Sequence, residues 1–470
     1  MPFAIGGNQL DTGYEVSNSL RFNDDDSPRL TREFAQEPTG NRKTFTISFW
    51  VKRSSLSSNH AVVSASTTSN FNDKLVGFRG DTNGIEVNNV ASGSDAIQII
   101  TNRKFRDISA WYHIVVAIDT TQSSLADGVK LYVNGERDTS FDGSPVYNQN
   151  ATFEIGRNGS TTAIGMMQVN STQFFDGYLA EMHFIDGVQK DQTDFGEFND
   201  NGVWIPKKYD GTYGNNGFYL EFKQTGTSQN SSGIGADTSG QDQHFAVTNL
   251  AAIDVTTDTC TNNFATFNPL DNDTITGAAS FSEGNLVINA NSDAQSGCPT
   301  TIAVSNGKWY IEGKCLSSTF EIGVFGYGDG FSFNLANHPP YGDNGYPFAY
   351  NFGGNLTINN SDSQTGVGTF TTNDILAIAL DMDNNTIKFF KNGSQVGSTI
   401  TDSNLTTFAP YSFYVANHTG SNTNMFSLNT GNPAFSISSG NSDAEGHGNF
   451  EFAPPSGYFA LCTKNLAEYG

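Results

Sequence analysis

Short stretches in which apolar and polar residues alternate recur along the whole chain. In residues 44–52 the apolar side chains Phe45, Ile47, Phe49 and Val51 occupy every second position. This period of two is typical of a β-strand that buries one face against a core. Similar segments follow at short intervals, separated by turns rich in Gly, Asn, Ser and Asp, and hardly any stretch has the period of an amphipathic helix. The pattern predicts an all-β protein.

One hairpin plan occurs in each half of the chain. Residues 375–393 comprise a buried strand, a polar turn, a returning strand and an Asn-Gly pair, and residues 111–135 repeat the plan with a looser central turn. An Asn-Gly pair tolerates the positive φ that tight turns require. We therefore predict two antiparallel β-sandwiches in tandem, each with one of these hairpins near its centre.

The predicted strands divide the chain into an N-terminal arm, a jelly roll, a connector and a second sandwich, at residues 1–18, 19–190, 191–264 and 265–470. The connector contains Trp204 and Tyr219. Aromatic residues of this kind are not expected in a flexible linker, which is rich in Gly and Ser. We therefore expect the connector to be ordered and to lie along the first sandwich.

The chain is strongly acidic. Its 470 residues include 48 Asp and Glu against 24 Lys and Arg, which gives a formal net charge of −24. Such a field repels phosphate backbones and anionic lipids, so binding to nucleic acid or to a membrane surface is disfavoured. Solubility alone is sufficient to account for this acidity. Binding of divalent cations or life in a saline environment would also account for it, and the sequence leaves all three possibilities open.

Cysteine use and the N-terminus bear on where the protein acts. The four cysteines, Cys260, Cys298, Cys315 and Cys462, are too few for a disulfide framework and form no Cys-x-x-Cys pair. We expect free buried thiols, and the one pairing to check is Cys260 with Cys462. The chain has neither the start of a signal peptide nor a run of roughly 18 apolar residues. We therefore expect neither export by a signal peptide nor membrane insertion.

The first sandwich resembles the laminin-G-like jelly rolls of the concanavalin-A-like class. The segments that carry this resemblance are the strand at residues 45–52, the hairpin at 111–135, and the segments at 153–156 and 175–182. They are mostly core and turn residues, so the resemblance specifies the fold far better than it specifies a ligand.

The second sandwich resembles the SPRY (B30.2-type) domains. Five segments occur in an order similar to that of this family, at residues 307–312, 321–324, 374–383, 386–393 and 408–411. The chain departs from the family in a Ser/Gly-rich insertion between Asn429 and Phe452, which we expect to be a surface excursion.

The whole chain also resembles tail-fibre-like structural proteins of bacteriophages, many of them from marine hosts. The segments concerned are residues 19–23, 41–46, 213–222, 261–270 and 454–458. The resemblance implies a virion component on the exterior of the tail or capsid. Such a protein is made in the host cytoplasm without a signal peptide. It also implies a homo-oligomer, commonly a trimer, although no coiled-coil heptad in the sequence sets the oligomeric state.

Catalytic residues are not evident in the sequence. A glycosidase on a concanavalin-A-like jelly roll needs two carboxylates on one strand face, about 5–5.5 Å apart in a retaining enzyme. Glu181, with His183 and Asp186 nearby, does not match that pattern. Asp381 and Asp383 sit at a predicted hairpin turn, where Asp usually bonds to its own backbone. We therefore expect no enzymatic activity.

Two groups of residues are candidates for binding. Asp24 and Asp26, together with Asp176, offer oxygen ligands that suit Ca²⁺, although a solvated turn accounts for the same acidic triplet. In the aromatic loop that ends at residue 350, the candidate ligand-binding residues are Tyr341, Asp343, Tyr346 and Phe348. Exposed aromatic rings beside Asp and Asn suit stacking on sugars or contact with a protein. The alternative is that these aromatic residues pack beneath the loop.

Together these observations predict a non-enzymatic phage virion protein, a tail fibre or a particle decoration, that recognises the host surface through a glycan. Its expected partners are other virion proteins and a glycan or receptor on the host cell. Two alternatives remain open. The first is a purely structural virion subunit without a ligand of its own, and the second is a polysaccharide-degrading enzyme on a concanavalin-A-like fold.

Overall fold

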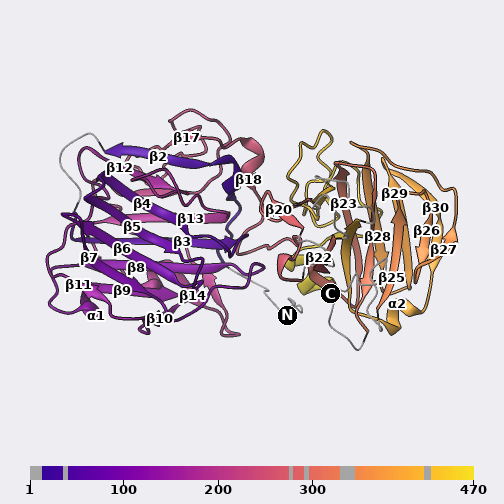
Figure 1. Cartoon of the computed structure of the whole chain (residues 1–470), viewed down its shortest axis with the longest axis horizontal. Helices are drawn as coiled ribbons and strands as arrows, with labels where there is room; N and C mark the ends of the chain where they lie inside the picture. Colours follow the sequence, from indigo (N-terminus) through magenta and orange to yellow (C-terminus); the bar gives the residue numbers. More distant parts are fainter. Residues whose placement is uncertain are drawn as a thin grey trace. The chain divides into compact units, whose positions relative to one another are not determined.

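The computed structural model describes residues 13–34, 41–271, 273–274, 279–289, 296–328, 345–417 and 425–470. The chain divides into two compact units, one spanning Asp11–Thr261 and the other containing Asn262–Gly470 (Figure 1). Each unit contains two large sheets whose strands pair almost entirely antiparallel, so the prediction of an all-β fold with two tandem sandwiches is confirmed. Within the described ranges, the helices are too short to cross a bilayer.

The first unit is a sandwich of two sheets of eight strands each. Its first sheet runs in the order β10-β9-β8-β3-β13-β1-β18, with β16 paired to β13. These strands are β1 (Ser19–Phe22), β3 (Thr44–Arg53), β8 (Tyr112–Asp119), β9 (Val129–Val133), β10 (Glu136–Asp138), β13 (Gly177–Asp186), β16 (Phe218–Leu220) and β18 (Val255–Thr256). The short helices of this unit are η1 (Asp24–Asp26), α1 (Leu125–Gly128), η2 (Gln192–Asp194) and η3 (Ala252–Asp254).

The second sheet of this unit runs in the order β11-β7-β6-β5-β4-β12-β2-β17. Its strands are β2 (Arg29–Phe34), β4 (His60–Thr68), β5 (Phe71–Phe78), β6 (Ile85–Ala91), β7 (Ser94–Ile100), β11 (Val146–Tyr147), β12 (Ser160–Ile164) and β17 (Ala246–Thr248). A separate small hairpin pairs β14 (Gly196–Phe198) with β15 (Trp204–Pro206).

The core of the first unit lies between its two sheets. Phe45, Ile47, Phe49 and Val51 of β3 are fully buried there, as their alternation predicts. The opposite face of β3 is also buried, since only 5 % of Trp50 is exposed. A strand with one solvated face would expose such a residue, so a further layer must cover the first sheet.

The connector supplies that layer. Its strands extend both sheets, because β16 pairs with β13, β17 with β2, and β18 with β1. In the part that precedes β16, it lays aromatic side chains over the outer face of the first sheet, namely Phe195, Trp204, Tyr209 and Tyr213. The connector up to Thr261 is therefore a structural part of the first unit.

The second unit is also a sandwich. One sheet runs in the order β19-β22-β31-β24-β25-β26-β27. Its strands are β19 (Asp273–Thr274), β22 (Ser296–Val304), β24 (Phe320–Gly326), β25 (Tyr346–Asn351), β26 (Leu356–Ile358), β27 (Ser361–Gln364) and β31 (Tyr411–Asn417).

The facing sheet runs in the order β20-β21-β32-β23-β28-β29-β30, with β33 paired to β23. Its strands are β20 (Ser280–Ser282), β21 (Val287–Asn289), β23 (Lys308–Cys315), β28 (Ile375–Asp381), β29 (Thr386–Lys391), β30 (Ser394–Thr401), β32 (Phe426–Asn429) and β33 (Phe459–Ala460). The helices η4 (Pro269–Asp271), α2 (Asn404–Thr407) and α3 (Thr463–Tyr469) complete the unit.

The two predicted hairpins are present, one in each unit. In the first unit β8 pairs with β9, and in the second β28 pairs with β29. Both Asn-Gly pairs have positive φ at each residue: 48° and 81° at Asn134 and Gly135, and 48° and 78° at Asn392 and Gly393. These dihedrals belong to the type I′ turn, whose twist matches that of the strands it joins.

The insertion after β32 is only partly a surface excursion. Its middle is largely exposed, but Thr430 and Phe450 at its two ends are fully buried. Phe450 packs edge-to-face on Tyr310 of β23, with ring centroids 5.2 Å apart. The insertion therefore covers the outer face of the sheet that contains β23, where Phe450 clusters with Tyr310 and with Ala377 and Ala379 of β28.

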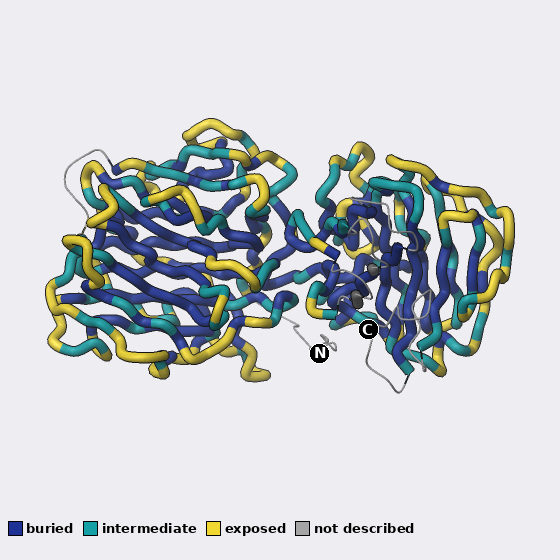
Figure 2. Tube along the Cα trace, in the orientation of Figure 1, coloured by how far each residue is buried: buried dark blue, intermediate teal, exposed yellow. Residues whose placement is uncertain are grey.

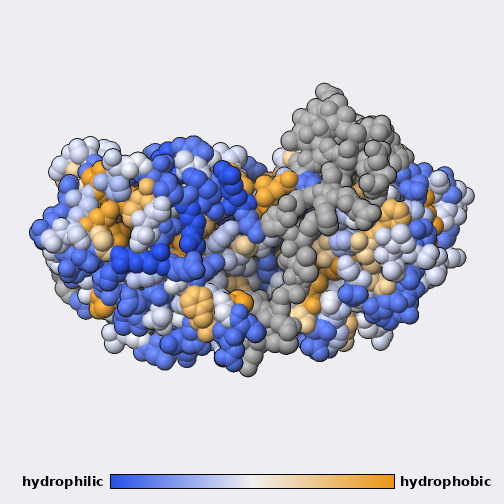
Figure 3. All heavy atoms as spheres, turned by 90° about the horizontal axis from the view of Figure 1, so that it is seen from below, coloured by the Kyte–Doolittle hydropathy of each residue, from blue (hydrophilic) through white to orange (hydrophobic). Residues whose placement is uncertain are grey.

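Burial and surface character follow this layered arrangement. The strands are buried over most of their length and the loops are exposed (Figure 2). On the face of the first unit that Figure 3 shows, hydrophilic residues predominate and apolar residues form smaller patches. All four cysteines are buried free thiols, so Cys260 and Cys462 are not bridged.

Candidate functional site

The predicted calcium ligands do not form a cluster that could hold a metal ion. In the described part of the chain, no group of three or more His, Cys, Asp and Glu side chains is placed to do so. Asp26 accepts a hydrogen bond from the Asn23 amide at 2.8 Å, and Asp24 Oδ2 lies 3.8 Å from His60 Nε2. Asp24 and Asp26 belong to the short helical turn η1, in line with the alternative that the sequence left open.

Asp176 lies in a different electrostatic setting. It is 7 % exposed, and its charge acts on the buried guanidinium of Arg53. Burial lowers the pKa of Arg53 to about 10, and the Asp176 charge works in the opposite direction. A guanidinium beside this carboxylate opposes a second cation at the same place. Binding of Ca²⁺ to these residues stays a prediction without support from the geometry.

Only part of the predicted aromatic site falls within the described residues. Tyr341 and Asp343 lie outside them. Phe348 on β25 is fully buried in the core of the second unit. Tyr346 stacks on Phe408 with ring centroids 4.9 Å apart, and its hydroxyl donates to Asp402 at 3.3 Å. Phe348 is therefore a core residue that cannot contact a ligand, and its prediction as a ligand-binding residue is wrong.

The carboxylates considered for catalysis are held by neighbouring groups. Glu181, at a bulge in β13, accepts hydrogen bonds from Tyr219 at 2.7 Å and from Tyr14 at 2.9 Å, one on each oxygen. Asp381 accepts two bonds from Asn384, and Asp383 accepts one from the Gly307 backbone amide. Asp381 and Asp383 thus make the hydrogen bonds expected of Asp in a turn, and Glu181 makes those expected of a buried carboxylate.

His113 is likewise structural. Its Nδ1 accepts from Trp204 Nε1 at 3.0 Å, which leaves the proton on Nε2, 2.9 Å from the Ser48 hydroxyl. Burial lowers the pKa of His113 to about 3, so the imidazole is neutral over the physiological range. The ring joins β8 to the connector through Trp204 and is closed to solvent.

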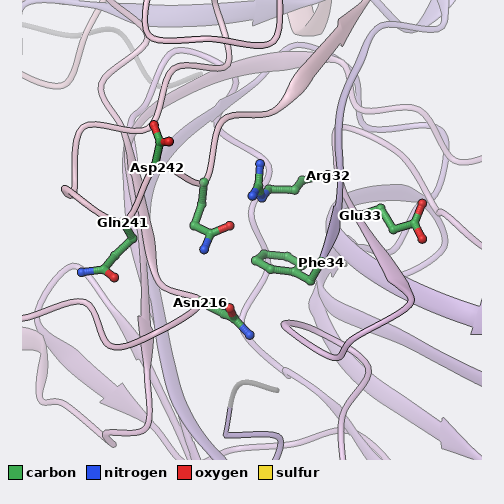
Figure 4. Close-up of a pocket in the computed structure, with 7 residues that line it drawn as sticks. Arg32, Glu33, Phe34, Asn216, Gln241 and Asp242 are labelled. Carbon is green, nitrogen blue, oxygen red and sulfur yellow. The ribbon is translucent and has the colours of Figure 1, made fainter. Parts of the chain in front are cut away.

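The structure contains a pocket that the sequence did not predict. It has a volume of about 310 Å³ and lies in the first unit between β2 and the connector. We call it the connector pocket; it is lined by Arg32, Glu33, Phe34, Asn216, Gln241, Asp242 and Gln243. Figure 4 shows Arg32 and Phe34 pointing from β2 toward the connector, whereas Glu33 points to the other side of the strand.

The pocket is polar with one aromatic wall. Asn216, which is 6 % exposed, donates from its amide to the Gly156 carbonyl at 2.8 Å. The guanidinium carbon of Arg32 lies 5.6 Å from the centroid of the Phe34 ring. A few fixed polar groups around an apolar surface are typical of small-molecule sites, whose volumes begin at roughly 300 Å³. The connector pocket is therefore a candidate binding site.

The pocket could not be predicted from the sequence, because the residues that line it are far apart in the chain. Arg32 and Gln243 are separated by more than two hundred positions, and only the pairing of β17 with β2 brings their segments together. One local signal was available. Leu30, Arg32 and Phe34 occupy alternate positions of a strand, so a charged residue stands in the row expected to face the core.

Comparison with known protein families identifies both units. Residues 31–193 match the model of the concanavalin A-like lectin/glucanases superfamily, in its laminin G form, and residues 308–427 match the SPRY domain. The chain combines a laminin G-like domain with a SPRY domain. Both are typical of binding and adhesion modules. Among curated proteins no match was found.

Several solved structures are similar in part to this chain. The SPRY domain of human HERC1 matches with 18 % identity over 34 % of this chain and 96 % of that one, at a TM-score of 0.28. A heptameric SAP-like pentraxin from Limulus polyphemus matches with 16 % identity over 38 % and 80 %, at 0.28. Domains LG4-5 of the mouse laminin alpha1 chain match with 8 % identity over 97 % and 90 %, at 0.29. At these TM-scores the likenesses support no further conclusion.

Proposed function

We propose that the protein is a non-enzymatic component of a bacteriophage particle that attaches the particle to a glycan on the host surface. It serves as a tail fibre or as a decoration on the particle exterior, and it assembles with other virion proteins as a homo-oligomer. The observation that carries the proposal is the tandem of a laminin G-like and a SPRY domain, two domain types that typically bind. The likeness of five segments to phage tail-fibre proteins supports the virion setting.

The absence of enzymatic activity belongs to the same proposal. It is supported by the roles of the candidate carboxylates, since tyrosine hydroxyls hold both oxygens of Glu181 under the connector. A general acid or nucleophile must reach the substrate in its reactive protonation state. Release of reducing ends from host polysaccharides by the purified protein would overturn this part of the proposal.

The test is binding of labelled full-length protein to intact candidate host cells and to a glycan array, with and without Ca²⁺. We expect saturable binding to at least one host that is lost when periodate has oxidised the surface sugars. Binding that survives periodate but not protease treatment of the cells would replace the glycan by a protein receptor. A folded protein that binds no surface would favour the purely structural subunit. Calcium-dependent binding would restore the site at Asp24, Asp26 and Asp176.

A further inference from the structure

Arg32 stands where the strand pattern calls for an apolar residue. Its neighbours in the same row, Leu30 and Phe34, are 0 % and 2 % exposed and belong to the core. One guanidinium nitrogen, Nη1, donates to the His244 carbonyl at 2.8 Å, but the buried Nε has no hydrogen-bond partner. An unpaired buried donor is unfavourable, so this Nε is a candidate contact for a ligand group that accepts a hydrogen bond.

Gln243 presents the matching acceptor. Its side-chain oxygen Oε1 is buried and also lacks a partner, while its amide nitrogen Nε2 donates to the Asn215 carbonyl at 3.3 Å. The bond through Nε2 fixes the amide so that Oε1 remains available. The connector pocket therefore holds one unused donor and one unused acceptor, both shielded from bulk water.

The pocket wall that carries Gln243 is locked in place. The Asp237 carboxylate accepts four hydrogen bonds: from the backbone of Tyr219, from the backbone and hydroxyl of Ser239, and from the backbone of Gln243. His244 Nδ1 accepts from the Asp237 amide at 2.9 Å. A site that is rigid before binding loses little entropy when a ligand enters, so weak polar contacts suffice.

The charges around the pocket disfavour an anion. His244 Nε2 lies 2.8 Å from Asp242 Oδ1, and because Nδ1 accepts a bond, the neutral tautomer with its proton on Nε2 satisfies both contacts. The positive charge of Arg32 is opposed by the nearby charges of Asp237 and Asp242. The net charge of −24 adds a repulsive field for any polyanion.

We propose that the connector pocket binds one neutral sugar unit, with Arg32 Nε donating to a ring hydroxyl and Gln243 Oε1 accepting from one. A hydroxyl is both donor and acceptor, so a vicinal diol satisfies both groups without bringing in charge. Phe34 also lines the pocket, but it is only 2 % exposed, so the two polar groups carry the recognition. This inference rests on the proposed function and names the site and ligand class that serve it.

The experiment uses the full chain and simple probes. Binding of methyl α-galactoside, methyl α-glucoside, methyl α-mannoside, N-acetylglucosamine and glucuronate is measured by ligand-observed NMR at millimolar concentration. Gln241→Trp adds bulk at the pocket lining, because Gln241 is exposed and lines the pocket. Gln243→Met and Arg32→Met remove the two unused polar groups. Gln395→Trp on exposed β30 of the second unit is the matched control.

We expect at least one neutral sugar to bind, glucuronate to bind at least fivefold more weakly, and all three pocket variants to lose at least tenfold in affinity while the control does not. If neutral sugars bind Gln243→Met and Arg32→Met as tightly as the wild type, the pocket assignment is overturned, but glycan recognition stands. If no sugar binds while the protein still adheres to periodate-sensitive host cells, the pocket is again refuted and the proposed function survives. Stronger binding of glucuronate would overturn the ligand class.

Discussion

Glu312 makes the stability of the second unit depend on pH. This carboxylate on β23 is fully buried and accepts hydrogen bonds from the backbone amides of Glu451 and Phe452 at 2.6 and 3.2 Å. The Asn429 amide and the Tyr310 hydroxyl donate to it at 3.1 and 3.3 Å. Glu312 therefore links β23 to the end of the insertion that follows β32. Burial raises the pKa of Glu312 to about 7, although these hydrogen bonds act to lower it.

The sign and size of the effect follow from linkage. The folded protein holds the Glu312 proton more tightly than the unfolded chain, in which the pKa is about 4.5. The stabilisation is therefore fully present below pH about 4.5 and is lost as the pH rises through about 7. At about 1.4 kcal/mol per pKa unit, the unfolding free energy should fall by roughly 2–3 kcal/mol between pH 5 and pH 8.

The perturbation is Glu312→Gln, which cannot ionise. The difference in unfolding free energy between wild type and variant cancels every other titrating group, so it isolates Glu312. We expect wild type to lose roughly 2–3 kcal/mol relative to the variant between pH 5 and pH 8. Glu468→Gln, at an exposed position of α3, is the control and should leave the pH dependence unchanged.

The buried cysteines allow each unit to be followed separately. Cys315 and Cys298 lie in the second unit and Cys260 lies in the first, and all are buried. Samples in a urea series at pH 5 or pH 8 receive a brief thiol-labelling pulse at one common pH, and mass spectrometry gives the labelled fraction at each cysteine. A wild-type-to-variant difference that is the same at both pH values would refute the reasoning.

Of three further predictions, two concern the first unit and one concerns the cysteines of both units. Gly135→Ala should destabilise the first unit by roughly 2–4 kcal/mol in urea unfolding, because the added methyl group meets the Trp204 ring at a residue of positive φ. Gly143→Ala, also at positive φ but with nothing within 4 Å, should cost only about 1 kcal/mol. Equal costs for the two variants would contradict this account. Tyr219→Phe should cost about 2 kcal/mol by removing one hydrogen bond to buried Glu181, and an unchanged urea midpoint would argue against that bond. The four cysteines should resist a thiol-specific reagent in the native protein and react fully in urea, since burial raises the pKa of each thiol; rapid native labelling would count against their burial.

The sequence by itself determined the fold class and the order of the two domains. A β-strand places alternate side chains on one face, so the apolar row of β3 and the buried strand β28 are readable one segment at a time. The Asn-Gly turns are equally local, because positive φ at two successive residues is a property of the turn alone. Such features need no knowledge of distant parts of the chain.

What covers the sheets and where a pocket forms depend on contacts between distant segments. Local sequence accounts for Gly135 through its positive φ, whereas the packing of Trp204 against it depends on where the connector lies. Phe348 and Tyr346 look alike as loop aromatics, and full burial in the core is what sets Phe348 apart. The connector pocket arises because β17 pairs with β2, which brings Gln243 to Arg32. Such contacts depend on which strands pair, and the local periodicity of the sequence does not specify that pairing.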